Sequence, residues 1–225
     1  MKLKNILQRV FGPNSSVSFR LEINGIPFGR SMMIWDKTER GFLFRFYTEI
    51  DNKPLGLGDS QCTDIAFYQC DSCGRPIEFE RESKGQRLKI TFQVNKINVV
   101  MPDNSSLTIE TGQIDTVFDN NLIGLTALFY AHCWDKNEFR MHGFSGHVFI
   151  ASQLTVAPYR IFPEADGLHF QSSFKEIVEL NENGRLLSLS LPKQAIIVRS
   201  EDNNISRDEV IYYLSKTILN KKPHL

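Results

Sequence analysis

The side chains best suited to acid–base chemistry lie at the end of a long apolar segment with a helical pattern, residues 119–134. His132 places an imidazole in this otherwise apolar segment, and Tyr130 and Asp135 lie close to it in the sequence. An imidazole changes charge near physiological pH, so it can donate or accept a proton there. Ionisable groups in apolar surroundings occur often at functional sites. We therefore name His132, Tyr130 and Asp135 as candidate catalytic residues. The alternative interpretation is a hydrogen-bonded histidine in the core.

Aromatic residues supply a second set of candidates, because the chain has 17 phenylalanines and many fall at inward-facing positions of strand patterns. A sheet that curves around one helix can leave a cavity at its open end, and an aromatic lining suits a flat or lipid-like ligand. A glycine inside the helix costs about 1 kcal/mol relative to alanine, which indicates that another backbone or a ligand comes close to it. The candidate ligand-binding residues are Phe44, Phe46, Phe92, Gly124, Phe129 and His142. A packed core is the alternative for the phenylalanines.

The cysteines give little support for a metal site. Cys70-x-x-Cys73 followed by Gly74 resembles half of a zinc knuckle, but a structural zinc needs four ligands and only Cys62 lies nearby. We interpret this stretch as a hairpin turn that carries two thiols. The sequence therefore predicts neither a metal nor a cofactor.

The segment that carries His132 must itself be a buried helix. Apolar residues recur at helical spacing on one face through Leu125 and Phe129, and on the opposite face through Ile123 and Ala127. A helix that is apolar all round is buried all round. The apolar run is about a dozen residues long, whereas a bilayer span needs roughly 20, so we predict a core helix with no membrane span. Asp119 is the predicted N-cap, and Asn120 or Asn121 could take this role one register later.

Most other segments alternate apolar and polar residues, the pattern of strands with one buried face. Strands are expected at 17–23, 29–35, 42–48, 63–69, 77–81 and 88–94 before the helix, and at 138–142, 147–152, 156–162, 168–170, 174–180 and 186–191 after it. Turns are predicted at Asn24-Gly25 and Lys84-Gly85, between neighbouring strands. Short helices are expected within 1–12 and from a capping box that starts at Ser206. The fold class is therefore mainly β: a curved antiparallel sheet or partly open barrel wrapped around one central buried helix, with a C-terminal helix. We expect one domain over residues 1–225.

Charge and the N-terminus limit the partners and the compartment. Lysine plus arginine equals aspartate plus glutamate, 26 each, with no block of like charge, so we expect no nucleic-acid partner. Gln8 and Arg9 interrupt the stretch that a secretion signal would need to be apolar, which favours a cytoplasmic location. The cysteines would then stay as thiols. The oligomeric state is left open.

Two short stretches resemble a known family. Gly74-Arg75-Pro76 opening a strand, and residues 118–122 opening a helix, followed by paired strands, resemble a β-rich bacterial domain that occurs alone and also ahead of α/β-hydrolase domains. The resemblance covers about residues 16 to 200. It implies a curved sheet around a helix, similar to lipoprotein-carrier folds. Many members have no assigned activity, and the 225 residues hold no hydrolase domain, so no hydrolase activity is expected.

These observations lead to one functional expectation and two alternatives. We expect a domain that binds a hydrophobic small molecule at the open end of the sheet, near the helix. One alternative is a cofactor-independent enzyme, such as a cyclase or isomerase of specialised metabolism, that uses the same cavity. The other is a protein-interaction domain without a ligand. An apolar cavity with two or more converging polar groups favours the enzyme, a cavity without them favours binding, and no cavity favours interaction.

Overall fold

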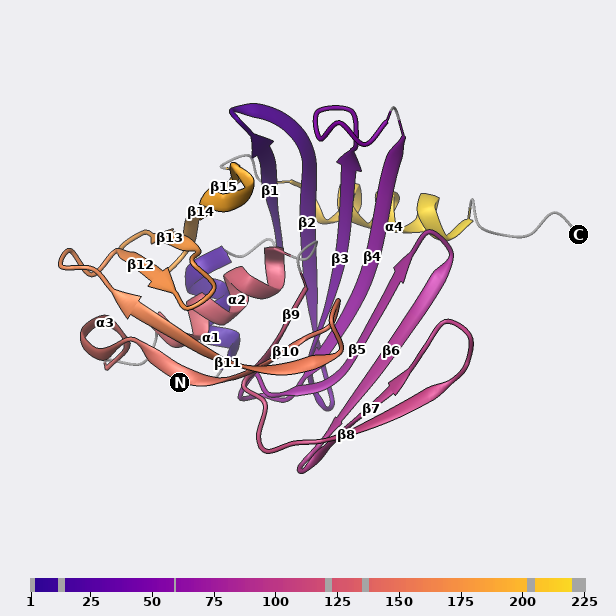
Figure 1. The fold of residues 1–225 in the computed structure, drawn as a ribbon, viewed down its shortest axis with the longest axis horizontal. Helices are drawn as coiled ribbons and strands as arrows, with labels where there is room; N and C mark the ends of the chain where they lie inside the picture. The colour runs from indigo at the N-terminus through magenta and orange to yellow at the C-terminus, as the bar shows by residue number, and fades with distance from the viewer. Residues whose placement is uncertain are drawn as a thin grey trace, which may run out of the picture.

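A single sheet organises the computed structural model, which describes residues 3–11, 15–58, 60–119, 123–134, 138–201 and 205–219. Within these residues the sheet has 15 strands in the order β8-β7-β6-β5-β4-β3-β2-β1-β15-β14-β13-β12-β11-β10-β9. Every neighbouring pair is antiparallel except β9 with β10, which is parallel. The predicted mainly antiparallel architecture is confirmed (Figure 1).

The chain builds the sheet in two passes that meet in the middle. The first pass is a meander of β1 (Ser16–Ile23), β2 (Ile26–Thr38), β3 (Gly41–Asp51), β4 (Gln61–Cys70), β5 (Pro76–Ser83), β6 (Gln86–Gln93), β7 (Lys96–Val100) and β8 (Ser106–Glu110). The second pass is β9 (Thr116–Phe118), β10 (Phe144–Ile150), β11 (Thr155–Pro163), β12 (His169–Ser172), β13 (Ile177–Leu180), β14 (Leu186–Leu191) and β15 (Ile196–Ser200). Pairing of β15 with β1 joins the two passes.

Tight turns with left-handed backbone set the register of the meander. Asn24 and Gly25, between β1 and β2, have φ angles of 50° and 76°. Lys84 and Gly85, between β5 and β6, have φ angles of 50° and 78°. Two-residue hairpin turns of this kind need positive φ at both positions because their twist matches that of the strands. Both turns lie where the sequence predicts them.

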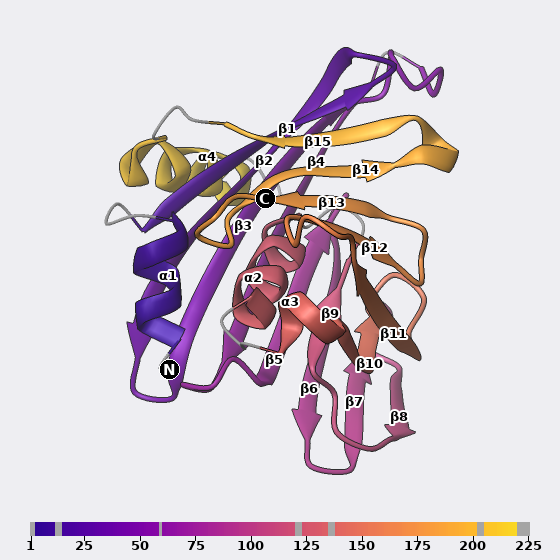
Figure 2. The same ribbon diagram turned by 90° about the vertical axis from the view of Figure 1, so that its left-hand side faces the viewer.

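The central helix α2 (Ile123–Trp134) lies in the hollow of the sheet, and all its residues except His132 are buried. Helix α1 (Leu3–Phe11) packs against it, with its apolar residues buried (Figure 2). The sheet is curved but not closed, since β8 and β9 are both edge strands. The edge strand β9 nevertheless contacts β5, so the sheet curls far enough to enclose α2. None of the described helices has the length and apolar character that crossing a bilayer requires.

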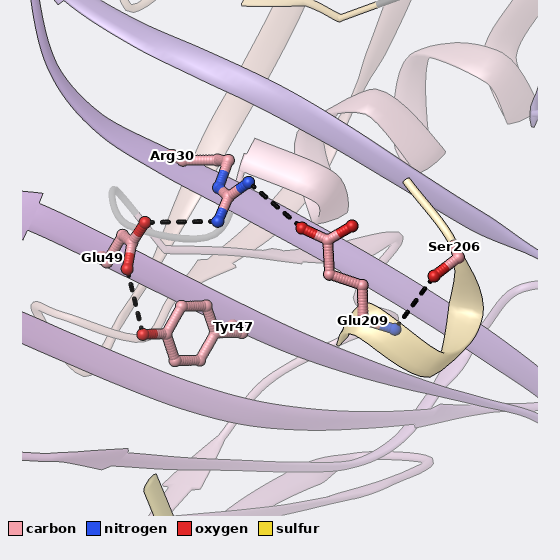
Figure 3. A network of polar contacts seen from close by, with 5 residues as sticks. All are labelled: Arg30, Tyr47, Glu49, Ser206 and Glu209. Atoms are coloured by element: carbon pink, nitrogen blue, oxygen red, sulfur yellow. Dashed lines mark hydrogen bonds and ion pairs between the residues drawn. The ribbon is translucent and has the colours of Figure 1, made fainter. Parts of the chain in front are cut away.

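The C-terminal helix α4 (Arg207–Leu219) covers the outer face of β2 and β3. A separate apolar cluster forms there, with Met32, Ile34, Tyr47, Ile65, Ile205, Val210 and Leu214 buried. Strand β2 is thus buried on both faces, which explains why its apolar residues run continuously instead of alternating. The predicted helix start is confirmed, because Ser206 Oγ accepts a hydrogen bond of 3.1 Å from the N–H of Glu209. The Glu209 carboxylate reaches Arg30 instead, at 3.7 Å (Figure 3).

Several local predictions were wrong. Residues 138–142 do not form a strand: Phe139–His142 is a short helix, α3, whose Phe139 ring stacks on Phe170 with centroids 4.8 Å apart. A five-residue apolar pattern cannot distinguish one helical turn from a strand. Strands β7, β8, β9 and β15 were missed. Strand β14 ends at Leu191 as expected, and the chain then turns through Pro192–Gln194 and returns as β15.

Candidate functional site

A cavity of about 520 Å³ lies between the first half of α2 and both passes of the sheet. Apolar side chains form most of its wall. They come from three stretches of the chain: from β1 to the loop after β3, from β9 to the start of α2, and from β10 to β15. They are Leu21, Phe28, Ile50, Leu55, Phe118, Ile123, Ile150, Phe174, Leu189, Leu191, Ile196 and Val198. This volume and lining are in the range of small-molecule binding sites.

Polar groups enter this wall at a few points, namely Asp119, Thr126, Gln153, Glu176 and Gln194. The titratable residues among the described lining residues are Asp119 and Glu176, both acidic, and no lysine, arginine or histidine is among them. The site therefore combines an apolar surface with two carboxylates.

The Asp119 carboxylate is held in a buried ionic cluster. Arg81 donates to it across 2.7 Å and to Asp64 across 3.2 Å. The Asp64 and Asp119 side chains are only 1% and 0% exposed. The cluster fixes the segment before α2 onto strands β4 and β5. Residues 120–122 lie outside the described part, so the predicted N-cap role of Asp119 stays a prediction.

Glu176 ends a chain of hydrogen bonds that starts on the central helix. The hydroxyl groups of Tyr130 and Tyr159 lie 2.9 Å apart, and Tyr159 donates to Glu176 Oε2 across 2.7 Å. Ser172 donates to the same oxygen across 2.8 Å. Burial raises the pKa of Tyr130 and of Tyr159 well above the usual range, so both hydroxyls stay protonated and able to donate. These hydrogen bonds connect α2 with the cavity wall.

The three candidate catalytic residues do not come together at this cavity. Tyr130 enters the hydrogen-bonded chain to Glu176. His132 lies beside Gly74, whose added Cβ would be 3.7 Å from the His132 Nδ1. It follows the wall residue Thr126 by six positions, about 9 Å along the helix axis at about 1.5 Å per residue. Asp135 lies outside the described residues. A catalytic role for His132 stays a prediction.

Four of the six candidate ligand-binding residues, Phe44, Phe46, Gly124 and Phe129, are buried in the core on or next to α2. Phe44 and Phe46 are fully buried. Gly124 does allow a close approach, as predicted, but the group that approaches is a side chain: an added Cβ would lie 2.7 Å from Phe46 Cε1. Phe92 is half-buried and meets the edge of Phe149, with centroids 5.8 Å apart.

Phe129 connects this core to the cavity. Its ring packs edge-to-face with that of Phe118, which lines the cavity, with ring centroids 5.6 Å apart. His142 is exposed at the end of α3. None of the six candidate ligand-binding residues is among the described lining residues, and their part in binding stays a prediction.

The cysteine-containing stretch forms a turn, as predicted. Asp71 Oδ1 accepts hydrogen bonds from the N–H groups of Cys73 and Arg75, at 2.8 Å and 2.9 Å. Burial raises the pKa of the Cys70 thiol far above its usual value, which makes it a poor nucleophile and metal ligand. Across the described ranges, no group of three or more His, Cys, Asp or Glu residues is placed to hold a metal ion.

Sequence reasoning missed Glu176, the carboxylate that the cavity presents. The only local signal is a pair of charged residues, Lys175 and Glu176, between Phe174 and Ile177 in a strand-like stretch. Its hydrogen-bond donor Tyr159 is 17 residues earlier, and Tyr130 is 29 residues before Tyr159. Periodicity within one segment carries no information on such pairings.

Comparisons with known proteins find similar solved structures but no related sequence. No family model and no curated protein matches the sequence. Among solved structures, the chain is similar to a β-barrel-like protein of the domain of unknown function DUF1849 from Brucella abortus, with 12% identity and a TM-score of 0.47 over 83% of this chain and 93% of that chain. It is also similar to a DUF1089 family protein from Pseudomonas aeruginosa, with 12% identity and a TM-score of 0.45 over 73% of this chain and 90% of that chain.

Proposed function

We propose that the protein binds a hydrophobic small molecule in the cavity between the curved sheet and α2. The observation that carries the proposal is the apolar wall of this cavity of about 520 Å³. Moving apolar surface out of water contributes roughly 25 cal/mol per Å², so a ligand of matching size gains affinity mainly from its apolar body. The proposed location is the cytoplasm, on the sequence argument alone.

Native mass spectrometry of the protein purified from its own host tests the proposal. We expect a retained small molecule of apolar character on a fraction of the chains. Ile196→Trp, which puts an indole into the cavity, should remove it. Ile197→Trp is the matched control, because neighbouring residues of β15 point to opposite faces of the sheet and Ile197 is not among the lining residues. Equal ligand retention by wild type and Ile196→Trp would count against binding in this cavity.

An enzyme that uses the same cavity is the second candidate, and the chain Tyr130–Tyr159–Glu176 favours it. A carboxylate linked to hydroxyl groups can accept and return a proton at a bound substrate. Binding remains first because Asp119 is already paired with Arg81, which leaves Glu176 as the one carboxylate among the described lining residues that forms no ion pair.

Incubation with a metabolite extract of the host separates the two candidates. An enzyme should consume at least one metabolite, and Glu176→Gln should slow that consumption on the order of 10²-fold while leaving the fold intact. His132→Gln in the same assay tests the residue predicted from the sequence. If no metabolite is consumed while a ligand is retained, the protein is a binder.

A further inference from the structure

The carboxylate of Glu176 has a charge that its described surroundings do not balance. Its Oε2 accepts hydrogen bonds from two hydroxyl groups, which are uncharged donors. Among the described residues Oε1 has no hydrogen-bond partner and Glu176 forms no ion pair. The lining residues include no lysine, arginine or histidine. A negative charge in a largely apolar wall therefore faces the space that a ligand would fill.

One arginine contacts a residue of the cavity wall, Asp119. Arg81 binds both Asp64 and Asp119, so its guanidinium is not available to an anionic group in the cavity. A ligand carboxylate or phosphate would meet the Glu176 carboxylate with no compensating positive group among the described lining residues. Such like-charge contact is unfavourable.

Aromatic rings lie next to the tyrosine that donates to this carboxylate. Tyr159, which donates to Glu176, makes edge contacts with Phe118 at 4.8 Å and with Phe174 at 5.0 Å between ring centroids. Both phenylalanines line the cavity. The faces of aromatic rings attract cations, so rings beside a carboxylate suit an ammonium group.

We infer that the ligand is a cationic amphiphile, with an apolar body and an ammonium group that donates to Glu176. This inference rests on the proposed function, because it assigns the polar group of the molecule that the cavity would bind. The apolar body contacts the wall formed by β1, β14, β15 and α2, and the ammonium group lies at Oε1 of Glu176. A fatty acid, with the same body and the opposite charge, is excluded.

Three probes with the same alkyl chain test the inference on the full chain: decylamine, decanol and decanoate. Calorimetry at neutral pH should give decylamine an affinity about tenfold or more above that of decanol, since a hydrogen bond to a charged group contributes about 1.5 kcal/mol or more. Decanoate should bind more weakly than decanol. Decanoate binding as tightly as decylamine would overturn the inference while leaving hydrophobic binding intact.

Glu176→Gln is the decisive variant, because the amide oxygen can still accept from Tyr159 and Ser172. It should remove the preference for decylamine and leave the affinity for decanol unchanged. Glu179→Gln is the matched control: it makes the same charge change on β13, where Glu179 accepts from Ser188 and is not a lining residue. A decylamine preference that survives Glu176→Gln refutes the assignment.

A measurement on the wild type covers the case in which Glu176→Gln does not fold. Salt screens charge attraction in a partly open site, so the advantage of decylamine over decanol should shrink as ionic strength rises. An advantage that does not change with salt refutes the role of the carboxylate. If none of the three probes binds, the proposed function fails and the inference fails with it.

Discussion

Arg81 donates to the carboxylate of Asp119 across 2.7 Å and so ties β5 to the segment that leads into the central helix. Both partners are largely removed from water, and Asp64 shares the same guanidinium. A charge buried in this way depends on its partner far more than a surface charge does. Because Asp119 also lines the cavity, the ion pair that stabilises the fold also holds part of the cavity wall.

Replacing this arginine should therefore destabilise the protein severely. Arg81→Met keeps much of the apolar volume but removes the cation from two buried carboxylates, so the free energy of unfolding should fall by about 3–5 kcal/mol. Arg87→Met is the control, because Arg87 also pairs with a carboxylate, Glu80, but its side chain is 64% exposed. Arg87→Met should lower the free energy of unfolding, measured by urea titration, by at most about 1 kcal/mol. Similar losses for the two variants would contradict the role of the buried cluster.

Gly124 should not tolerate a methyl group. An added Cβ would lie 2.7 Å from Phe46 Cε1 and 3.0 Å from Met33 Sδ. We expect Gly124→Ala to cost about 1–3 kcal/mol by overpacking, despite the gain of about 1 kcal/mol in helix propensity.

Gly112→Ala is the control for this substitution, since Gly112 is exposed and nothing lies within 4 Å of its added Cβ. Its effect in urea titration should stay within about 0.5 kcal/mol. Adding Phe46→Leu to Gly124→Ala should recover part of the loss, because it removes the clash. Strictly additive losses in the double variant would show that the two residues do not compete for space.

The buried tyrosine pair predicts a loss of stability in alkali. Burial holds the pKa of Tyr130 and of Tyr159 above that of an unfolded chain, so their contribution is fully present below about pH 10 and is lost as the pH rises through and beyond that value. Tyr130→Phe should reduce the fall in unfolding free energy above about pH 10, at most by about 1.4 kcal/mol per pH unit.

Tyr212→Phe serves as the control for alkaline unfolding, because Tyr212 is 59% exposed. Denaturant titrations at several pH values measure both slopes. The Tyr212 variant should keep the wild-type slope. A Tyr130 variant with an unchanged slope would mean that this hydroxyl does not ionise differently in the two states.

The N-cap of α4 should stabilise this helix without changing the stability of the core around α2. Ser206→Ala removes the acceptor for the N–H of Glu209 and should destabilise α4 by about 1 kcal/mol. Ser215→Ala, at an exposed position of the same helix, should have little effect. Hydrogen exchange should speed up in α4 of the Ser206 variant and stay unchanged in α2. Equal acceleration in both helices would mean that the outer cluster and the main core open together.

Local signals were enough to predict the class of fold. The apolar alternation from Val17 to Ile23 and the turn at Asn24 and Gly25 depend only on neighbouring residues, and both are present as predicted. The central helix followed from an apolar pattern with no polar face, which only a fully enclosed helix can have. Ser206 marked the start of α4 for the same local reason.

The tertiary structure decided which segments meet, and therefore where the cavity lies. Strand β15 has no distinctive pattern, yet its pairing with β1 closes the gap between the two passes of the sheet. Tyr130 was chosen from the sequence as a neighbour of His132, but its hydroxyl meets Tyr159 on β11 instead. Glu176, which lines the cavity, accepts a hydrogen bond from the same Tyr159. Periodicity fixes the direction of a side chain within its own element, whereas partners far apart in the sequence are set by the packing of the whole chain.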